Sequence, residues 1–206
     1  MSREIFLPHG AVKLPAFFPD GTRGVVRCVD SEDLEKCGVQ GIVMNAYHLM
    51  TKPGAATIKS LGGLNAFANW KRPIITDSGG FQVFSLLREN SSMGEIRPNE
   101  IIFRRNGKKT ILSPEKCIQS QLAYGSDILM ALDYCTHPAD SYELQSQAVD
   151  TTIRWAEKCR DVFQNTSNNK LPKNQSLLEG GSGETFSSEK VLPPRLINLR
   201  AIFNSA

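Results

Sequence analysis

A carboxylate, two glycines and an aromatic residue follow one another in residues 76–84, which read TDSGGFQVF. Asp77 ends an apolar run, and the residues after it are Ser78, Gly79, Gly80 and Phe81. Glycine lets a backbone take positive φ values and approach a ligand closely. A carboxylate accepts hydrogen bonds from the edge of a planar heterocycle such as guanine, and an aromatic ring stacks on its face. The segment therefore predicts a site for a planar base, with a strand-to-helix turn capped by Asp77 as the alternative.

A second aspartate follows another apolar run in the same way. Asp133 comes directly after residues 127–132, which read DILMAL. Taken alone, Asp133 could equally cap a helix or form a salt bridge. Two aspartates at neighbouring strand ends favour a shared pocket, because like charges placed together are costly unless a ligand or a proton compensates.

Apolar runs of strand length alternate with segments that carry helix signals. Strands are predicted at residues 21–26, 39–45, 73–76 and 127–132, and helices at residues 31–38, 55–63, 64–70 and 113–125. A long helix is predicted from residue 140, since Asp140 and Glu143 have the spacing of a capping box. Residues 100–112 differ, because an Asn-Gly pair between two β-rich arms predicts a hairpin.

Strands that are apolar throughout and alternate with helices are typical of a parallel sheet covered by helices. We therefore predict an α/β fold, with which a doubly wound sheet and a (β/α)₈ barrel are both compatible. In either fold, functional residues gather at the C-terminal ends of the strands. The chain offers about four βα units plus the inserted hairpin, whereas a complete barrel uses about 250 residues. Residues 1–164 are assigned to this partial barrel, and residues 165–206 to a divergent, poorly ordered tail.

Composition narrows the class of protein. The 206 residues carry a net charge of +3, which permits an RNA partner without requiring one. No apolar run approaches the roughly 20 residues that span a bilayer, and the N-terminal segment lacks the apolar core of a secretory signal, so we expect a cytoplasmic protein. The cysteines are odd in number and irregularly spaced. This pattern predicts buried free thiols rather than disulfides or a metal site, for Cys28, Cys37, Cys117, Cys135 and Cys159.

Several long segments resemble the tRNA-guanine transglycosylase family. They are residues 45–54 (NAYHLMTKPG), 61–86 (LGGLNAFANWKRPIITDSGGFQVFSL), 113–140 (SPEKCIQSQLAYGSDILMALDYCTHPAD) and 152–161 (TIRWAEKCRD). The resemblance covers about three quarters of the chain, and the stretch DYCTHPAD is nearer to the bacterial type. It implies the N-terminal half of a (β/α)₈ barrel enzyme of queuosine biosynthesis. Such enzymes exchange guanine at the wobble position of a tRNA anticodon for a 7-deazaguanine base, preQ1 or queuine.

The resemblance also implies roles for the residues of the first segment. Asp77 would be the general acid/base and would contact the heterocycle. Ser78, Gly79 and Gly80 would complete that wall of the pocket, and Phe81 would stack on the base.

The resemblance extends to a second group of residues and to the partners. Asp133 would recognise the edge of the base, while Asn45 and His48 would line or support the pocket. The implied partners are tRNA, the deazaguanine base, and a second subunit in a homodimer or heterodimer. No membrane is expected as a partner.

Three features of the family have no clear counterpart in the sequence. The covalent nucleophile, an aspartate that attacks the anomeric carbon of the ribose, is not found. The glycine-rich base-binding strand, GIVQGG, has only a weak likeness at residues 177–181. The zinc site of three cysteines and a histidine is not matched, so no cofactor is expected. Three interpretations stay open: a transglycosylase, a non-catalytic half-barrel that binds a base or a partner, and an inactive truncated product.

Basic residues surround the predicted hairpin turn. They are Arg104, Arg105, Lys108 and Lys109. They could contact RNA phosphates or form a solvated face, and both interpretations remain open.

Overall fold

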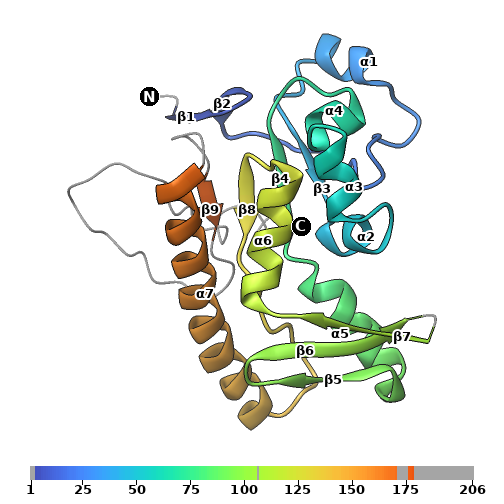
Figure 1. Ribbon diagram of the computed structural model, residues 1–206, viewed down its shortest axis with the longest axis vertical. Coiled ribbons are helices and arrows are strands. Elements are labelled where there is room, and N and C mark those ends of the chain that lie inside the picture. The colour runs from blue at the N-terminus through green and yellow to red at the C-terminus, as the bar shows by residue number, and fades with distance from the viewer. Residues whose placement is uncertain (1–2, 106, 171–175, 179–206) are drawn as a thin grey trace.

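The centre of the fold is a parallel sheet with the strand order β3-β4-β8-β9 (Figure 1). The computed structural model describes residues 3–105, 107–170 and 176–178. The strands of this sheet are β3 (Ile42–Met44), β4 (Ile74–Thr76), β8 (Ile128–Met130) and β9 (Ser176–Leu178). All three residues of β4 are buried, which explains why this strand is apolar throughout. The predicted α/β fold with a parallel sheet is confirmed, and none of the described sheets closes on itself.

Helices connect and cover these strands. Four short helices occupy the first third of the chain: α1 (Ser31–Lys36), α2 (Ala46–Thr51), α3 (Ala55–Ser60) and α4 (Leu64–Ala68). Helix α5 (Gly80–Glu89) follows β4, α6 (Pro114–Tyr124) precedes β8, and α7 (Tyr142–Lys170) follows it. The predicted signals at α6 are confirmed, since Ser113 accepts the Lys116 N–H and Gly125 ends the helix in the left-handed conformation.

A three-stranded antiparallel sheet is inserted between α5 and α6. After a 3₁₀ turn η1 (Ser91–Met93), its strands β5 (Gly94–Arg97), β6 (Glu100–Arg105) and β7 (Lys108–Leu112) pair in the order β5-β6-β7. The predicted hairpin is therefore confirmed as β6 and β7, and β5 is an additional strand that the sequence pattern did not reveal. The indole N–H of Trp155 on α7 donates to the Pro98 carbonyl at 2.8 Å, which ties the β5–β6 turn to the long helix.

An N-terminal hairpin, β1 (Arg3–Leu7) with β2 (Gly10–Leu14), was not predicted from the sequence. It lies at the opposite end of the molecule from the β5–β7 sheet (Figure 1). Asp127, immediately before β8, is fully buried and accepts the backbone N–H groups of His9 at 3.0 Å and Ile74 at 2.9 Å. Nδ1 of the His9 ring lies 2.9 Å from the same carboxylate. The hairpin is thereby fixed to the N-terminal ends of β4 and β8.

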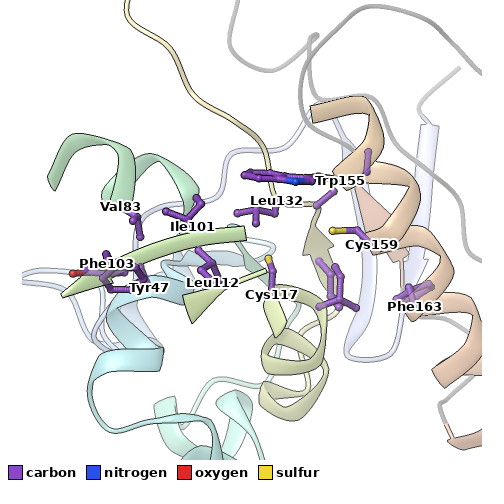
Figure 2. Packing of buried hydrophobic residues seen from close by; sticks show 14 residues of the cluster. Tyr47, Val83, Ile101, Phe103, Leu112, Cys117, Leu132, Trp155, Cys159 and Phe163 are labelled. Atoms are coloured by element: carbon purple, nitrogen blue, oxygen red, sulfur yellow. The ribbon is translucent and has the colours of Figure 1, made fainter. Parts of the chain in front are cut away.

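Hydrophobic clusters pack against both faces of the sheet, and two of them share one face. One joins α7 and α6 to the antiparallel sheet, with Trp155, Phe163 and Phe103 almost completely buried (Figure 2). The other packs α2, α3 and α4 around Trp70 and Met44. A third cluster, on the opposite face, packs Leu7 and Val12 of the N-terminal hairpin against Ile75 and Ile128. Apolar side chains thus cover both faces of β4 and β8, as parallel strands require.

Two local predictions were wrong. Residues 21–26 form turns rather than a strand, because the Asp20 carboxylate accepts both the N–H and the hydroxyl of Thr22, and Gly24 has a φ of +80°. The capping box at residue 140 is displaced by one residue. Ser141 accepts the Leu144 N–H at 3.3 Å, whereas Asp140 accepts the His137 N–H and pairs with Arg88.

The structure also describes two parts of the segment assigned to the tail. Helix α7 continues to Lys170, and β9 (Ser176–Leu178) pairs with β8 in parallel register. The weak likeness to a glycine-rich strand at residues 177–181 therefore begins at a strand that lies next in the sheet. Residues 179–206 lie outside the described part of the chain.

Candidate functional site

Three polar residues meet at the C-terminal ends of three neighbouring strands. Asn45 directly follows β3, Asp77 directly follows β4, and Asp133 lies three residues beyond the end of β8. Because β4 pairs with β3 on one side and with β8 on the other, Asp77 is the central member. The prediction that the two aspartates occupy adjacent strand ends is confirmed.

The Asp77 carboxylate is held by three hydrogen bonds. Its Oδ2 accepts the side-chain amide of Asn45 at 2.6 Å. Its Oδ1 accepts the backbone N–H groups of Ala46 at 2.8 Å and Gly79 at 3.1 Å. Ala46 begins α2, and Gly79 is the N-cap of α5, so the carboxylate faces the starts of two helices. The capping alternative is therefore partly correct, and the same contacts fix both oxygens in one orientation.

Burial outweighs these hydrogen bonds in setting the protonation of Asp77. Burial raises the pKa of this carboxyl from 3.8 to about 6, the amides of Ala46 and Gly79 act in the opposite direction, and the nearby charges of Asp133 and Asp20 raise it further. A carboxyl with a pKa near neutrality exchanges a proton readily at physiological pH, which suits a general acid/base.

Asp133 is joined to the Asp77 loop through a hydroxyl. Oγ of Ser78 donates to Oδ1 of Asp133 at 3.1 Å, and the Cys135 thiol donates to Oδ2 at 3.3 Å. Burial and the charge of Asp133 raise the pKa of the Cys135 thiol, so this thiol stays protonated and acts as a donor. No sequence pattern pointed to this contact of Cys135, apart from its position two residues after the aspartate.

The two glycines permit close contacts between protein segments. Gly79 has a φ of +73°, and a Cβ there would lie 2.9 Å from the backbone nitrogen of Tyr47. At Gly80, a Cβ would lie 3.0 Å from the carbonyl oxygen of Asp133 and 3.2 Å from its Oδ1. The prediction of an unusual φ is confirmed for Gly79. Gly79 lets the Asp77 loop pack closely against α2, and Gly80 lets it pack closely against the loop that carries Asp133.

The other predicted site residues lie near this centre but differ in exposure. Phe81, in the first turn of α5, is 61% exposed, and its ring centroid lies 6.4 Å from that of Phe84. His48 is exposed, and its backbone N–H donates to Oδ1 of Asn45. Through its backbone N–H, His48 therefore helps to orient the side-chain amide of Asn45, which in turn contacts Asp77.

A buried polar network lies directly before the two aspartate loops and links the strands that carry them. Gln121 on α6 is fully buried; its Oε1 accepts the Met130 N–H at 2.9 Å and lies 2.8 Å from the Thr76 hydroxyl. Its amide donates to the Met130 carbonyl at 2.8 Å. Gln121 thus links the ends of β4 and β8, directly before the two aspartate loops. Its only sequence signal was a polar residue among the apolar positions of the predicted helix.

None of the cysteines forms a disulfide, and they occupy different environments. Cys117 and Cys159 are buried and Cys135 is partly buried, as predicted, but Cys28 and Cys37 are exposed, so the prediction of buried thiols was wrong for these two. Within the described residues, no group of three or more potential metal-ligating side chains comes together. No helix in that part of the chain is long and apolar enough to cross a membrane.

Comparisons with known proteins find similar sequences over most of the chain. Residues 3–185 match the family model described as queuine tRNA-ribosyltransferase. Similar curated proteins of that name come from Lysinibacillus sphaericus (41% identical, covering 87% of this chain and 46% of the relative) and from Thermotoga neapolitana (43%, covering 76% and 42%). A third, from Geobacillus kaustophilus, is 45% identical and covers 74% of this chain and 40% of its own length.

The chain thus spans less than half the length of these curated relatives. The match nevertheless includes the three strand ends and the loops that carry Asn45, Asp77 and Asp133. The family model covers most of the chain, and the relatives exceed 40% identity over long, continuous segments. The chain therefore belongs to the tRNA-guanine transglycosylase family, whose fold is a TIM-type (β/α)₈ barrel, and corresponds to its N-terminal portion.

Proposed function

We propose that the chain provides the base-binding side of a tRNA-guanine transglycosylase, which exchanges guanine in a tRNA anticodon for a 7-deazaguanine base. The observation that carries this proposal is the placement of two carboxylates at adjacent strand ends, where Ser78, next to Asp77, donates to Asp133 and the pKa of Asp77 is about 6. In this proposal, strands β3, β4, β8 and β9 are neighbouring strands of a (β/α)₈ barrel, and β5–β7 is an insertion.

Asp77 is assigned the proton transfers. A base that leaves a ribose must gain a proton, and the base that replaces it must lose one, so the two transfers balance over a complete exchange. A single carboxyl with a pKa near 6 can donate the first proton and accept the second. Its hydrogen bonds from Asn45, Ala46 and Gly79 hold it in place through both steps. The covalent attack on the ribose is not assigned to a residue of this chain.

Asp133 is assigned the recognition of the base edge. An ionised carboxylate has two oxygens with about four acceptor positions, and Ser78 and Cys135 use one position on each oxygen. The remaining positions suit the adjacent ring N–H and amino group of guanine or a 7-deazaguanine. Phe81, exposed at the start of α5, supplies a ring that can stack on the face of the base.

Calorimetric titration with guanine and with preQ1 tests this proposal. Asp133→Ala should weaken binding at least tenfold, since losing a hydrogen bond to a charged group costs roughly 1.5–3 kcal/mol. The matched control is Asp161→Ala, which removes an exposed carboxylate from α7 and should bind as the wild type does. Equal affinity in the wild type and in Asp133→Ala would show that this carboxylate does not recognise the base.

A further inference from the structure

Positive charge is concentrated at the turn between β6 and β7. Four of the six residues from 104 to 109 are basic, although the whole chain has a net charge of only +3. The nearest acidic residues along the chain are Glu100 and Glu115. This basic turn lies at the periphery of the molecule, in the antiparallel sheet that is inserted between α5 and α6 (Figure 1).

The strand register places like charges directly opposite each other. Arg104 pairs with Lys109, and Arg105 pairs with Lys108. Like charges in directly opposed positions destabilise a hairpin. The side chains of Arg104, Lys108 and Lys109 are exposed, and none of the three forms an ion pair with another described residue. The repulsion between Arg104 and Lys109 is therefore left uncompensated within the described chain, and a bound polyanion would relieve it.

Buried residues connect the basic turn rigidly to the candidate base site. Phe103, next to Arg104, is fully buried, and its ring centroid lies 5.7 Å from that of Tyr47 (Figure 2). Tyr47 in turn packs against Gly79, whose amide binds Asp77. Because side chains alternate along a strand, Arg104 points away from the face that Phe103 buries.

We propose that Arg104 and Lys109 bind the phosphates of an RNA whose base enters the site at Asp77. This inference rests on the proposed function, because it places the backbone of the substrate RNA on the inserted sheet. Opposed residues on antiparallel strands lie about 4.5–5.5 Å apart, so their long side chains can reach neighbouring phosphates. An anionic membrane fits less well, because surface-bound segments insert apolar side chains, and the exposed large apolar residues of the described chain lie outside β6 and β7.

Binding of a stem-loop RNA with guanosine in its loop, followed by fluorescence anisotropy at several salt concentrations, tests the inference. Each phosphate contact in a single-stranded segment contributes about −0.7 to the slope of log K against log salt concentration. The double variant Arg104→Gln/Lys109→Gln should therefore reduce the slope by about 1.4. Between 50 and 200 mM salt, this makes the affinity of the wild type fall about sevenfold more than that of the variant.

The matched control is Lys13→Gln/Lys71→Gln, which removes the same charge from exposed positions near the N-terminal ends of the strands. It should retain the wild-type slope, and the hairpin variant should keep the wild-type affinity for guanine in calorimetry. The melting temperature of the hairpin variant should be unchanged or higher, because its substitutions remove a like-charge pair.

Three results would overturn the inference. They are an RNA affinity of the wild type that does not depend on salt, an unchanged salt slope in the hairpin variant, and a control variant whose salt slope falls as much as that of the hairpin variant. Tighter binding to phosphatidylserine vesicles than to RNA through the same residues would overturn it as well. Guanine titration separates the two proposals. If the wild type does not bind guanine but the hairpin variant still lowers the salt slope of RNA binding, the base site alone is refuted. If the wild type binds guanine but the hairpin variant leaves the salt slope unchanged, the RNA surface alone is refuted.

Discussion

Replacing Asp77 by asparagine removes a buried negative charge while leaving the side chain nearly the same size. The difference between its ordinary pKa of 3.8 and the value of about 6 in the folded protein corresponds to about 3 kcal/mol, at 1.36 kcal/mol per pH unit. The ionised carboxylate destabilises the folded state by this amount at pH values well above 6. Asp77→Asn abolishes that cost.

The substitution also has a cost of its own. Oδ1 of the asparagine can still accept the N–H groups of Ala46 and Gly79, but its Nδ2 would face Nδ2 of Asn45, and two donors cannot form a hydrogen bond. A lost and unsatisfied neutral hydrogen bond costs about 1–2 kcal/mol. We therefore expect Asp77→Asn to be about 1–2 kcal/mol more stable than the wild type at pH 8.

The difference should reverse in acid. Between pH 3.8 and about 6 the folded wild type binds more protons at Asp77 than the unfolded chain does, so this residue makes the wild type lose stability as the pH rises through that window. Well below pH 3.8 both states carry the proton, the charge penalty disappears, and the variant should be less stable by about 1–2 kcal/mol. Urea unfolding of both proteins at pH 3, 6 and 8 measures the change of about 3 kcal/mol.

An exposed aspartate provides the control for the loss of charge. Asp161→Asn on α7 changes the net charge by the same amount at a surface position. A stability difference between Asp77→Asn and the wild type that is constant from pH 3 to pH 8, or that follows the control, would refute the assignment of a raised pKa to Asp77.

Three further substitutions test the surroundings of the site. Gly80→Ala places a Cβ 3.0 Å from the Asp133 carbonyl oxygen, so the two loops must separate, and guanine affinity in calorimetry should fall while the far-UV spectrum stays unchanged. Gln121→Leu leaves the Met130 N–H and carbonyl without partners and should reduce the free energy of unfolding by about 2–4 kcal/mol in urea. Asp127→Ala removes the buried acceptor of the His9 and Ile74 amides and should cost about 3 kcal/mol, and a loss under 1 kcal/mol would show that the N-terminal hairpin is not anchored there.

The elements of the parallel sheet could be predicted because their signals are local. β3, β4 and β8 are short apolar runs, and the Asn-Gly pair specified the β6–β7 hairpin without any tertiary information. β5 and the β1–β2 hairpin were missed because partners distant in sequence stabilise them. The clearest case is Asp127, which binds His9 across a separation of 118 residues. Residues 21–26 were mistaken for a strand because their apolar pair Val25-Val26 follows a turn that the Asp20 side chain dictates.

The main residues of the site could be predicted from the sequence, but most of their contacts could not. The two aspartates and the glycine pair stand out in the sequence, and strand-end logic placed them together correctly. Family resemblance suggested Asn45 as a supporting residue, but its contact with Asp77 depends on the pairing of β3 with β4, which no spacing reveals. Gln121 and Cys135 act through neighbours on other segments, so their roles could be recognised only once those segments were placed in space.

The two amides that donate to Asp77 give the site its own spectroscopic reporters. Ala46 and Gly79 each direct a backbone N–H to the same carboxylate oxygen from different helix starts. When that oxygen loses its negative charge, both hydrogen bonds weaken together, because a charged acceptor binds more strongly than a neutral one. The amide proton resonances of these two residues should therefore move upfield in concert as the pH falls through about 6. Nuclear magnetic resonance can thus follow the ionisation of one carboxyl from two positions 33 residues apart in the sequence, with no substrate bound.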